Sequence, residues 1–226
     1  MSTPARAPRN SLSRELVVSR AVQLADRDGL AVLTIRALAA ECGVKPMAIY
    51  HHIASKEAIL DAIVDTVFEE VQLPQAQRPW REELAQRSRS MRAALGRHPW
   101  ALALLEARRN PGPATLRGHE ACLEVLRSAG FSLQATAHAY AVLDAFVYGF
   151  SLQEAMLGQI DLDGSAPELI EAMDLTRFPR MAEFATKHVL ADGYSFADSF
   201  EVGLDLVLDA LERLRTAFGQ SVSTRP

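Results

Sequence analysis

Cysteine, lysine and long apolar runs are all scarce in this sequence. Its 226 residues include two cysteines, Cys42 and Cys122, which lie in different regions and do not make a disulfide framework. No apolar run approaches the roughly 20 residues that a membrane-spanning helix needs. The first ten residues contain proline and arginine, and no hydrophobic segment follows them as in a secretory signal. We therefore expect a cytoplasmic protein without a structural disulfide or membrane span.

Basic residues are fewer than acidic residues, but they are concentrated in the N-terminal part of the sequence. The net charge of −4 argues against a protein that binds nucleic acid over its whole surface. Residues 1–56 nevertheless hold eight Lys/Arg and four Asp/Glu, whereas the remainder holds sixteen and twenty-four. Two of the three lysines, Lys45 and Lys56, lie in the positive segment, although three lysines can fall this way by chance. A positive end on an acidic body is what contact with phosphates through one end requires.

Two short helical patterns joined by a turn lie within this positive segment. The hydroxyl of Thr34 can cap the first helix, because it can accept a bond from a free N–H of the first turn. Cys42-Gly43 ends that helix, since glycine suits the left-handed conformation of a helix end. Pro46 fits the first turn of the second helix, where its missing N–H does no harm. Together these signals predict a helix-turn-helix.

The second of these helices has a buried face and an outward face. Ile49 and Ile53 are four residues apart and can share the buried face. The side chains expected to point outward are Lys45, Met47, Tyr50 and His51. A short helix with a basic and aromatic outer face fits the DNA major groove.

The remaining sequence shows helical periodicity, with no strand runs and no internal repeat. With 49% hydrophobic residues, the chain has ample material for a core. Helices are predicted over residues 13–28, 55–72, 84–95, 100–108, 116–129, 133–157, 181–190 and 195–218. Residues 158–180 are poorly periodic and predict a loop with a short helix.

The segment from Leu12 to Phe68 resembles the TetR-like (tetracycline repressor) family of transcription regulators. The residues that carry the resemblance are Leu30-Ala31-Val32-Leu33-Thr34, Leu38-Ala39, Gly43-Val44, Ile49-Tyr50-His51-His52-Ile53 and Lys56. The sequence after residue 79 is similar, more loosely, to the ligand-binding domain of tetracycline repressors. Its marks are Trp80, Ala94-Leu95, Gly130-Phe131-Ser132-Leu133, Gly149 and Gly203. The resemblance implies an all-α fold, with an N-terminal three-helix DNA-binding domain and a larger helical ligand-binding and dimerisation domain.

The predicted organisation has three parts. Residues 1–11 form a flexible tail, which is either inert or a basic arm that touches DNA. Residues 12–56 form the helix-turn-helix domain, with a connecting helix over 55–72, and residues 73–226 form the ligand-binding and dimerisation domain. The helices around 133–157 and 196–217 carry more apolar surface than one packed side uses. We therefore expect a homodimer through a four-helix bundle; two ordinary core helices are the alternative.

DNA contacts are expected from the start of each short helix and from the outward face. By resemblance, Thr34, Tyr50, His52 and Lys56 contact the backbone. Arg36 can donate to guanine, as can the lysine at position 45, although Arg36 can instead pair with a nearby acid. The full predicted DNA-contacting set is Thr34, Ile35, Arg36, Lys45, Pro46, Met47, Ala48, Tyr50, His51, His52 and Lys56. One short helix covers few base pairs, so we expect a dimer on a pseudo-palindromic operator.

The sequence offers no catalytic constellation, so we predict neither an enzyme nor a bound cofactor. The run from His119 to Leu123 begins like a zinc-protease HExxH, but Leu123 stands where the second histidine is needed. No phosphate-binding glycine loop, nucleophile elbow or CxxC is present. Asp61 and Asp65 share a helix face, which we interpret as solvated.

The second half is expected to bind a small-molecule effector instead. By resemblance, the pocket positions are Arg87, Met91, Leu105, His119, Cys122, Tyr140 and Asp144. The metal-contacting histidines of the tetracycline-binding relative fall on Gln72 and near Leu105, which are poor magnesium ligands. We therefore expect an apolar or aromatic effector rather than magnesium–tetracycline. Alternatively, His119, Cys122 and Tyr140 are satisfied core residues.

The preferred interpretation is a homodimeric repressor that a small molecule releases from its operator. An activator or a ligand-independent regulator of the same family is the first alternative. The second is an all-helical enzyme or carrier whose helix-turn-helix is only a packing motif. This last interpretation predicts no sequence preference and weak salt dependence of DNA binding, and the charge distribution argues against it.

Overall fold

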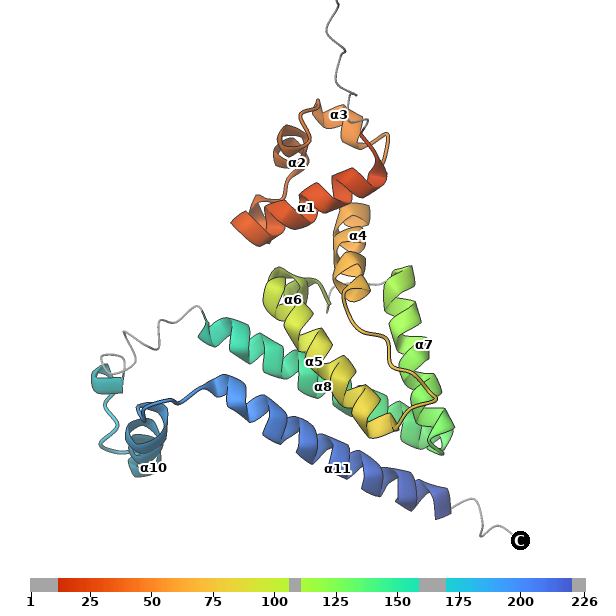
Figure 1. Ribbon diagram of the computed structural model, residues 1–226. Coiled ribbons are helices and arrows are strands. Elements are labelled where there is room, and N and C mark those ends of the chain that lie inside the picture. The colour runs from red at the N-terminus through yellow and green to blue at the C-terminus, as the bar shows by residue number, and fades with distance from the viewer. Residues whose placement is uncertain (1–11, 106–110, 159–169, 221–226) are drawn as a thin grey trace, which may run out of the picture. The chain divides into compact units, whose positions relative to one another are not determined.

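The computed structural model describes residues 12–105, 111–158 and 170–220, apart from the side chains of residues 218–220. The predicted flexible tail therefore lies outside the described residues, as do parts of the predicted loop at 158–180. Within the described ranges every regular element is helical and no strand occurs (Figure 1). The all-α prediction is confirmed.

Contacts between residues divide the chain into two units. The first runs to Glu70 and also includes residues 97–116, while the second comprises residues 71–96 and 117 onward. The predicted domains placed residues 97–116 beyond a boundary at residue 73, so the compact units divide the chain differently from those domains. Two helices, α5 (Trp80–Arg97) and α7 (Pro113–Ser128), continue from one unit into the other.

The first unit begins with four helices, three of which start at a side-chain cap. They are α1 (Arg14–Asp28), α2 (Ile35–Glu41), α3 (Pro46–Ile49) and α4 (Lys56–Glu69), with a 3₁₀ turn η1 (Leu30–Val32). Ser13, Thr34 and Ser55 each accept a bond from the backbone N–H three residues later, as Ser/Thr caps do. The predicted caps are therefore confirmed.

Helix α4 ends three residues before the predicted end at residue 72. Glu70 is its C-cap. The N–H of Gln72 bonds to the hydroxyl of Ser90 at 2.9 Å instead of to a carbonyl of the preceding turn. A side chain 18 residues away thus competes with helix continuation, which periodicity alone does not register.

The core of the first unit is apolar and continuous through α1, α2, α3 and α4. Its fully buried side chains include Val17, Leu38, Ile49 and Ile63. Helix α1 packs against both α2 and α4, and α6 (Trp100–Leu105) packs against α4. These contacts hold the helix-turn-helix as one body.

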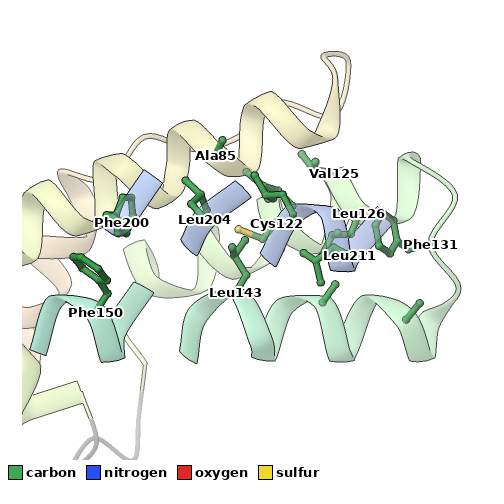
Figure 2. Close-up of a cluster of buried hydrophobic side chains, with 14 residues drawn as sticks. Ala85, Cys122, Val125, Leu126, Phe131, Leu143, Phe150, Phe200, Leu204 and Leu211 are labelled. Atoms are coloured by element: carbon green, nitrogen blue, oxygen red, sulfur yellow. The ribbon is translucent and has the colours of Figure 1, made fainter. Parts of the chain in front are cut away.

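The second unit is built mainly from α5, α7, α8 (Leu133–Leu157) and α11 (Ser199–Gln220). Helix α8 has the predicted boundaries, and Ser132 caps it as expected. Helix α11 packs along α8. Figure 2 shows their shared core, which includes Phe131, Phe150, Phe200 and Leu204.

Three predicted helices in this part of the chain are present but differ in their details. Helix α7 begins at Pro113 rather than at residue 116, because proline suits a first helical position. The predicted helix 181–190 is α10 (Pro179–Phe184) followed by a π-helical turn, η2 (Ala185–Val189). The last helix is preceded by a separate 3₁₀ turn, η3 (Phe196–Asp198).

Both cysteines are free: Cys42 is half-buried and Cys122 is buried. Among the described residues, no helix is both long and apolar enough to cross a bilayer.

Candidate nucleic-acid interface and ligand site

The turn between α2 and α3 sets the orientation of the outward helix. Gly43 adopts a φ of +67°, a left-handed conformation that glycine takes without a steric penalty. The N–H of Val44 then bonds to the carbonyl of Ala39 at 2.9 Å, which closes the turn. Pro46 occupies the first turn of α3, as predicted.

Helix α3 is short, and its buried face continues one turn beyond its end. Ile49 is fully buried and Ile53 is 4% exposed. Ile53 lies after α3, but its N–H bonds to the carbonyl of Ile49 at 3.1 Å, which keeps the helical spacing. The predicted shared face is therefore present, although the regular helix is shorter than the pattern indicated.

The outer face of this segment is open to solvent. Met47 is 71% exposed and Tyr50 is 42% exposed. The exposed members of the predicted DNA-contacting set are Thr34, Arg36, Lys45, Pro46, Met47, Tyr50, His51 and Lys56, and the half-buried members are Ile35, Ala48 and His52. The expected outward orientation is thus present, and contact with DNA stays a prediction.

The cations on this face are available to a partner. Arg36, Lys45 and Lys56 form no ion pair within the described ranges. Glu41, the last residue of the same helix, pairs with Arg27 at 2.5 Å. The arginine at position 36 therefore stays free to donate to an external acceptor.

In the second unit, by contrast, many arginines form ion pairs with carboxylates. Arg89 bonds to Glu201 through two nitrogens, and Arg81 lies 2.8 Å from Asp209. Such pairing neutralises cations that would otherwise attract phosphate. The contrast is consistent with an anionic partner at the helix-turn-helix.

A buried polar cluster lies inside the second unit. Arg87 on α5 is 2% exposed and donates to Asp144 on α8 at 2.9 Å. The ring of His119 on α7 stands edge-on to Tyr140 on α8, with centroids 5.2 Å apart. Cys122, one helical turn after that histidine, is buried in the adjoining apolar core (Figure 2). Five predicted pocket residues thus belong to this cluster or border it.

Burial changes the acidity of these groups. Burial raises the pKa of the Cys122 thiol to about 11, which keeps it neutral at physiological pH. Burial also raises the pKa of Tyr140, and the neighbouring Asp144 carboxylate raises it further. The pKa of His119 is lowered, again chiefly by burial. The cluster therefore presents neutral hydrogen-bonding groups around one ion pair.

Two predicted pocket residues remain, Met91 and Leu105. Met91 follows Arg87 by one turn of α5 and is fully buried. Leu105 ends α6 and belongs to the first unit, whereas the other predicted residues belong to the second. Within the described residues, no three His, Cys, Asp or Glu side chains gather in a way that could hold a metal ion.

Three polar residues of α8 were not among those predicted from the sequence: Thr136, Tyr148 and Ser151. Together with Tyr140 and Asp144, they recur every three or four residues along α8, so they share one face at about 100° per residue. The hydroxyls of Thr136 and Ser151 are buried and have no hydrogen-bond partner among the described residues. This spacing of polar residues along one face of α8 is present in the sequence itself.

Comparisons with known proteins agree with this geometry. Residues 17–63 match the family model for bacterial regulatory proteins of the tetR family, and residues 73–215 match the tetracyclin repressor-like C-terminal domain. The transcriptional repressor DrrR1 of Streptomyces coeruleorubidus is 30% identical over 223 residues, covering 93% of this chain and 81% of that protein. The class C tetracycline repressor of Escherichia coli is 30% identical over 209 residues, covering 91% and 93%.

Among solved structures, ActR of Streptomyces coelicolor in complex with actinorhodin superposes with a TM-score of 0.74. It is 25% identical to this chain and covers 89% of this chain and 97% of its own.

Proposed function

Because this chain belongs to the TetR family of bacterial regulatory proteins, we propose that it is a homodimeric transcriptional repressor which leaves its operator when a small molecule binds its second unit. The observation that carries the proposal is the exposed surface of α3, where unpaired cations accompany exposed Met47 and Tyr50. Exposed cations beside an aromatic side chain on a short helix are the groups that contact phosphates and base edges in a DNA groove.

In the proposed complex, α3 enters the major groove. Lys45 and Arg36 donate to base edges, and guanine O6 and N7 are their best acceptors. Lys56 stands at the start of α4, where the first-turn N–H groups also favour a phosphate. Phosphate contacts supply most of the affinity, and the groove contacts supply the sequence preference.

The dimer is proposed to form through α8 and α11. Helix α11 buries Phe200, Leu204, Leu208 and Leu211 within its own unit, yet Val202 is 64% and Leu206 is 65% exposed. Helix α8 likewise exposes Leu133, Val142, Leu152 and Met156. Two helices from each copy can cover these faces as a four-helix bundle.

The buried polar cluster is proposed to recognise the effector. Its buried arginine–aspartate pair, next to an apolar core, suits an organic molecule with an apolar body and hydrogen-bonding oxygens. The structure of ActR with actinorhodin supports an organic effector. Magnesium–tetracycline is not proposed, because the side chain of Leu105 offers no ligand atom and that of Gln72 offers only a neutral amide oxygen.

The test begins with selection of duplexes from a random pool by the full-length protein. Selected duplexes should share a pseudo-palindrome, and titration should give two chains per half-site pair. Binding should weaken by roughly 10³-fold or more between 50 and 200 mM salt, as expected for several phosphate contacts. Selection of no common sequence, or one chain per specific site, would contradict the proposal.

A further inference from the structure

Asp65, in the middle of α4, supplies the cap that α7 lacks. Its carboxylate accepts the N–H of Ala114 at 3.1 Å and the N–H of Thr115 at 3.0 Å. The same carboxylate also accepts the hydroxyl of Thr115 at 3.0 Å. The residue before α7 is Gly112, which has no side chain that could accept these bonds. Asp65 is therefore not the solvated residue predicted from its spacing.

Gly112 is fitted to this arrangement. A Cβ atom added there would lie 2.2 Å from the Cγ atom of Asp65, and 2.3 and 2.6 Å from its two oxygens. No real side chain tolerates such a distance, so any larger residue would displace the carboxylate. The carboxylate of Asp65 on α4 therefore occupies the space that a side chain at position 112, just before α7, would need.

The bonds between the first turn of α7 and the Asp65 carboxylate are favourable for an electrostatic reason. The first N–H groups of a helix have no partner within the helix and carry the positive end of its dipole. A carboxylate that accepts two of them forms charge-assisted bonds, which are stronger than neutral ones. If the first turn of α7 moves, it must either take α4 with it or break three hydrogen bonds.

The two helices lead to the two proposed sites. Helix α4 begins directly after the helix-turn-helix, capped by Ser55. Helix α7 carries His119 and Cys122 within two turns of Thr115. One continuous helix therefore joins the Asp65 contact to the effector cluster, and another joins it to the DNA-reading segment.

We propose that Asp65 is a positioning residue that couples the first turn of α7 to α4, so that effector binding along α7 is transmitted to the recognition helices. This inference rests on the proposed function and names the link by which one site acts on the other. Asp65 itself contacts neither ligand nor DNA.

The first measurement is hydrogen exchange of the Ala114 and Thr115 amides in the full-length protein without DNA. Asp65→Ala should accelerate their exchange roughly tenfold, the effect of losing a helix cap. Gly112→Ala should do the same from the other side of the contact, and the double variant should be no faster than either single variant. Asp65→Asn should restore part of the protection, because one amide oxygen can still accept.

The matched control is Thr66→Ala. Thr66 is the next residue of α4, and its hydroxyl donates to the carbonyl of Ala62 in the same helix, at 3.0 Å. This variant should leave the two α7 amides unchanged. Equal exchange in Asp65→Ala and wild type would overturn the inference, whatever the protein does with DNA.

The second measurement tests coupling, with a duplex selected from the random pool as the probe. Operator binding should change exchange of the Ala114 and Thr115 amides several-fold in wild type and in Thr66→Ala, but not in Asp65→Ala. If wild type binds the duplex and these amides do not respond, the coupling is absent. If no duplex is bound specifically, the proposed function fails, while the first measurement still decides whether Asp65 links the helices.

Discussion

Replacing Asp144 by alanine tests the energetics of the buried cluster most directly. The change leaves the guanidinium of Arg87, which is 2% exposed, without the carboxylate that now lies 2.9 Å away. A buried charge that loses its partner destabilises a protein by about 3–5 kcal/mol. For a chain of this length, that corresponds to a fall in Tm of roughly 6–20 °C.

The assay is urea unfolding at neutral pH, which should show a lower midpoint with an unchanged slope. Removing both charges, as Arg87→Met with Asp144→Leu, should restore most of the stability, since apolar replacement of a buried pair is often neutral. The matched surface control is Asp205→Ala, whose side chain is 72% exposed and pairs with Arg81. That control should cost less than about 1 kcal/mol.

Two results would refute this reasoning. One is a loss below about 1 kcal/mol for Asp144→Ala, which would mean that Arg87 is solvated or re-paired at little cost. The other is a double variant that is as unstable as the single one, which would mean that shape rather than charge holds the cluster. If the double variant folds but responds to no effector, the ion pair serves recognition rather than stability.

Three further predictions concern other parts of the chain. Lys45→Ala should weaken operator binding by about 1–3 kcal/mol and relax the preference for the base pair that the lysine contacts, as fluorescence anisotropy with the selected duplex and its single-base variants would measure. An unchanged affinity would contradict its place in the interface. His98→Ala should destabilise the protein by about 1–3 kcal/mol in urea, because the buried imidazole bridges Asp26 at 2.7 Å and Glu70 at 3.1 Å. A wild-type unfolding midpoint would show that these contacts contribute nothing. With a pKa raised to about 11, Cys122 should react with a thiol reagent far more slowly than half-buried Cys42 at pH 8, and its rate should rise about tenfold per pH unit as the thiolate forms. Equal rates for the two thiols would contradict its burial.

The local signals of the sequence determined most of the helices. Ser13, Thr34, Ser55 and Ser132 all cap the helices that they were predicted to cap. A cap joins residues only three positions apart, so the chain specifies it before any tertiary contact forms. The same applies to the turn at Gly43, whose φ is a local property.

Contacts between distant residues were decided by the tertiary structure alone. Arg87 and Asp144 are 57 positions apart, and Asp65 and Thr115 are 50 apart. Spacing along one helix says which residues share a face, but it does not say what that face meets. The spacing of Asp65 in α4 therefore predicts a solvated carboxylate, whereas in the folded chain this carboxylate accepts hydrogen bonds from the first turn of α7. Periodicity gives each helix its buried side, whereas only the packed chain pairs the polar groups that would otherwise be costly to bury.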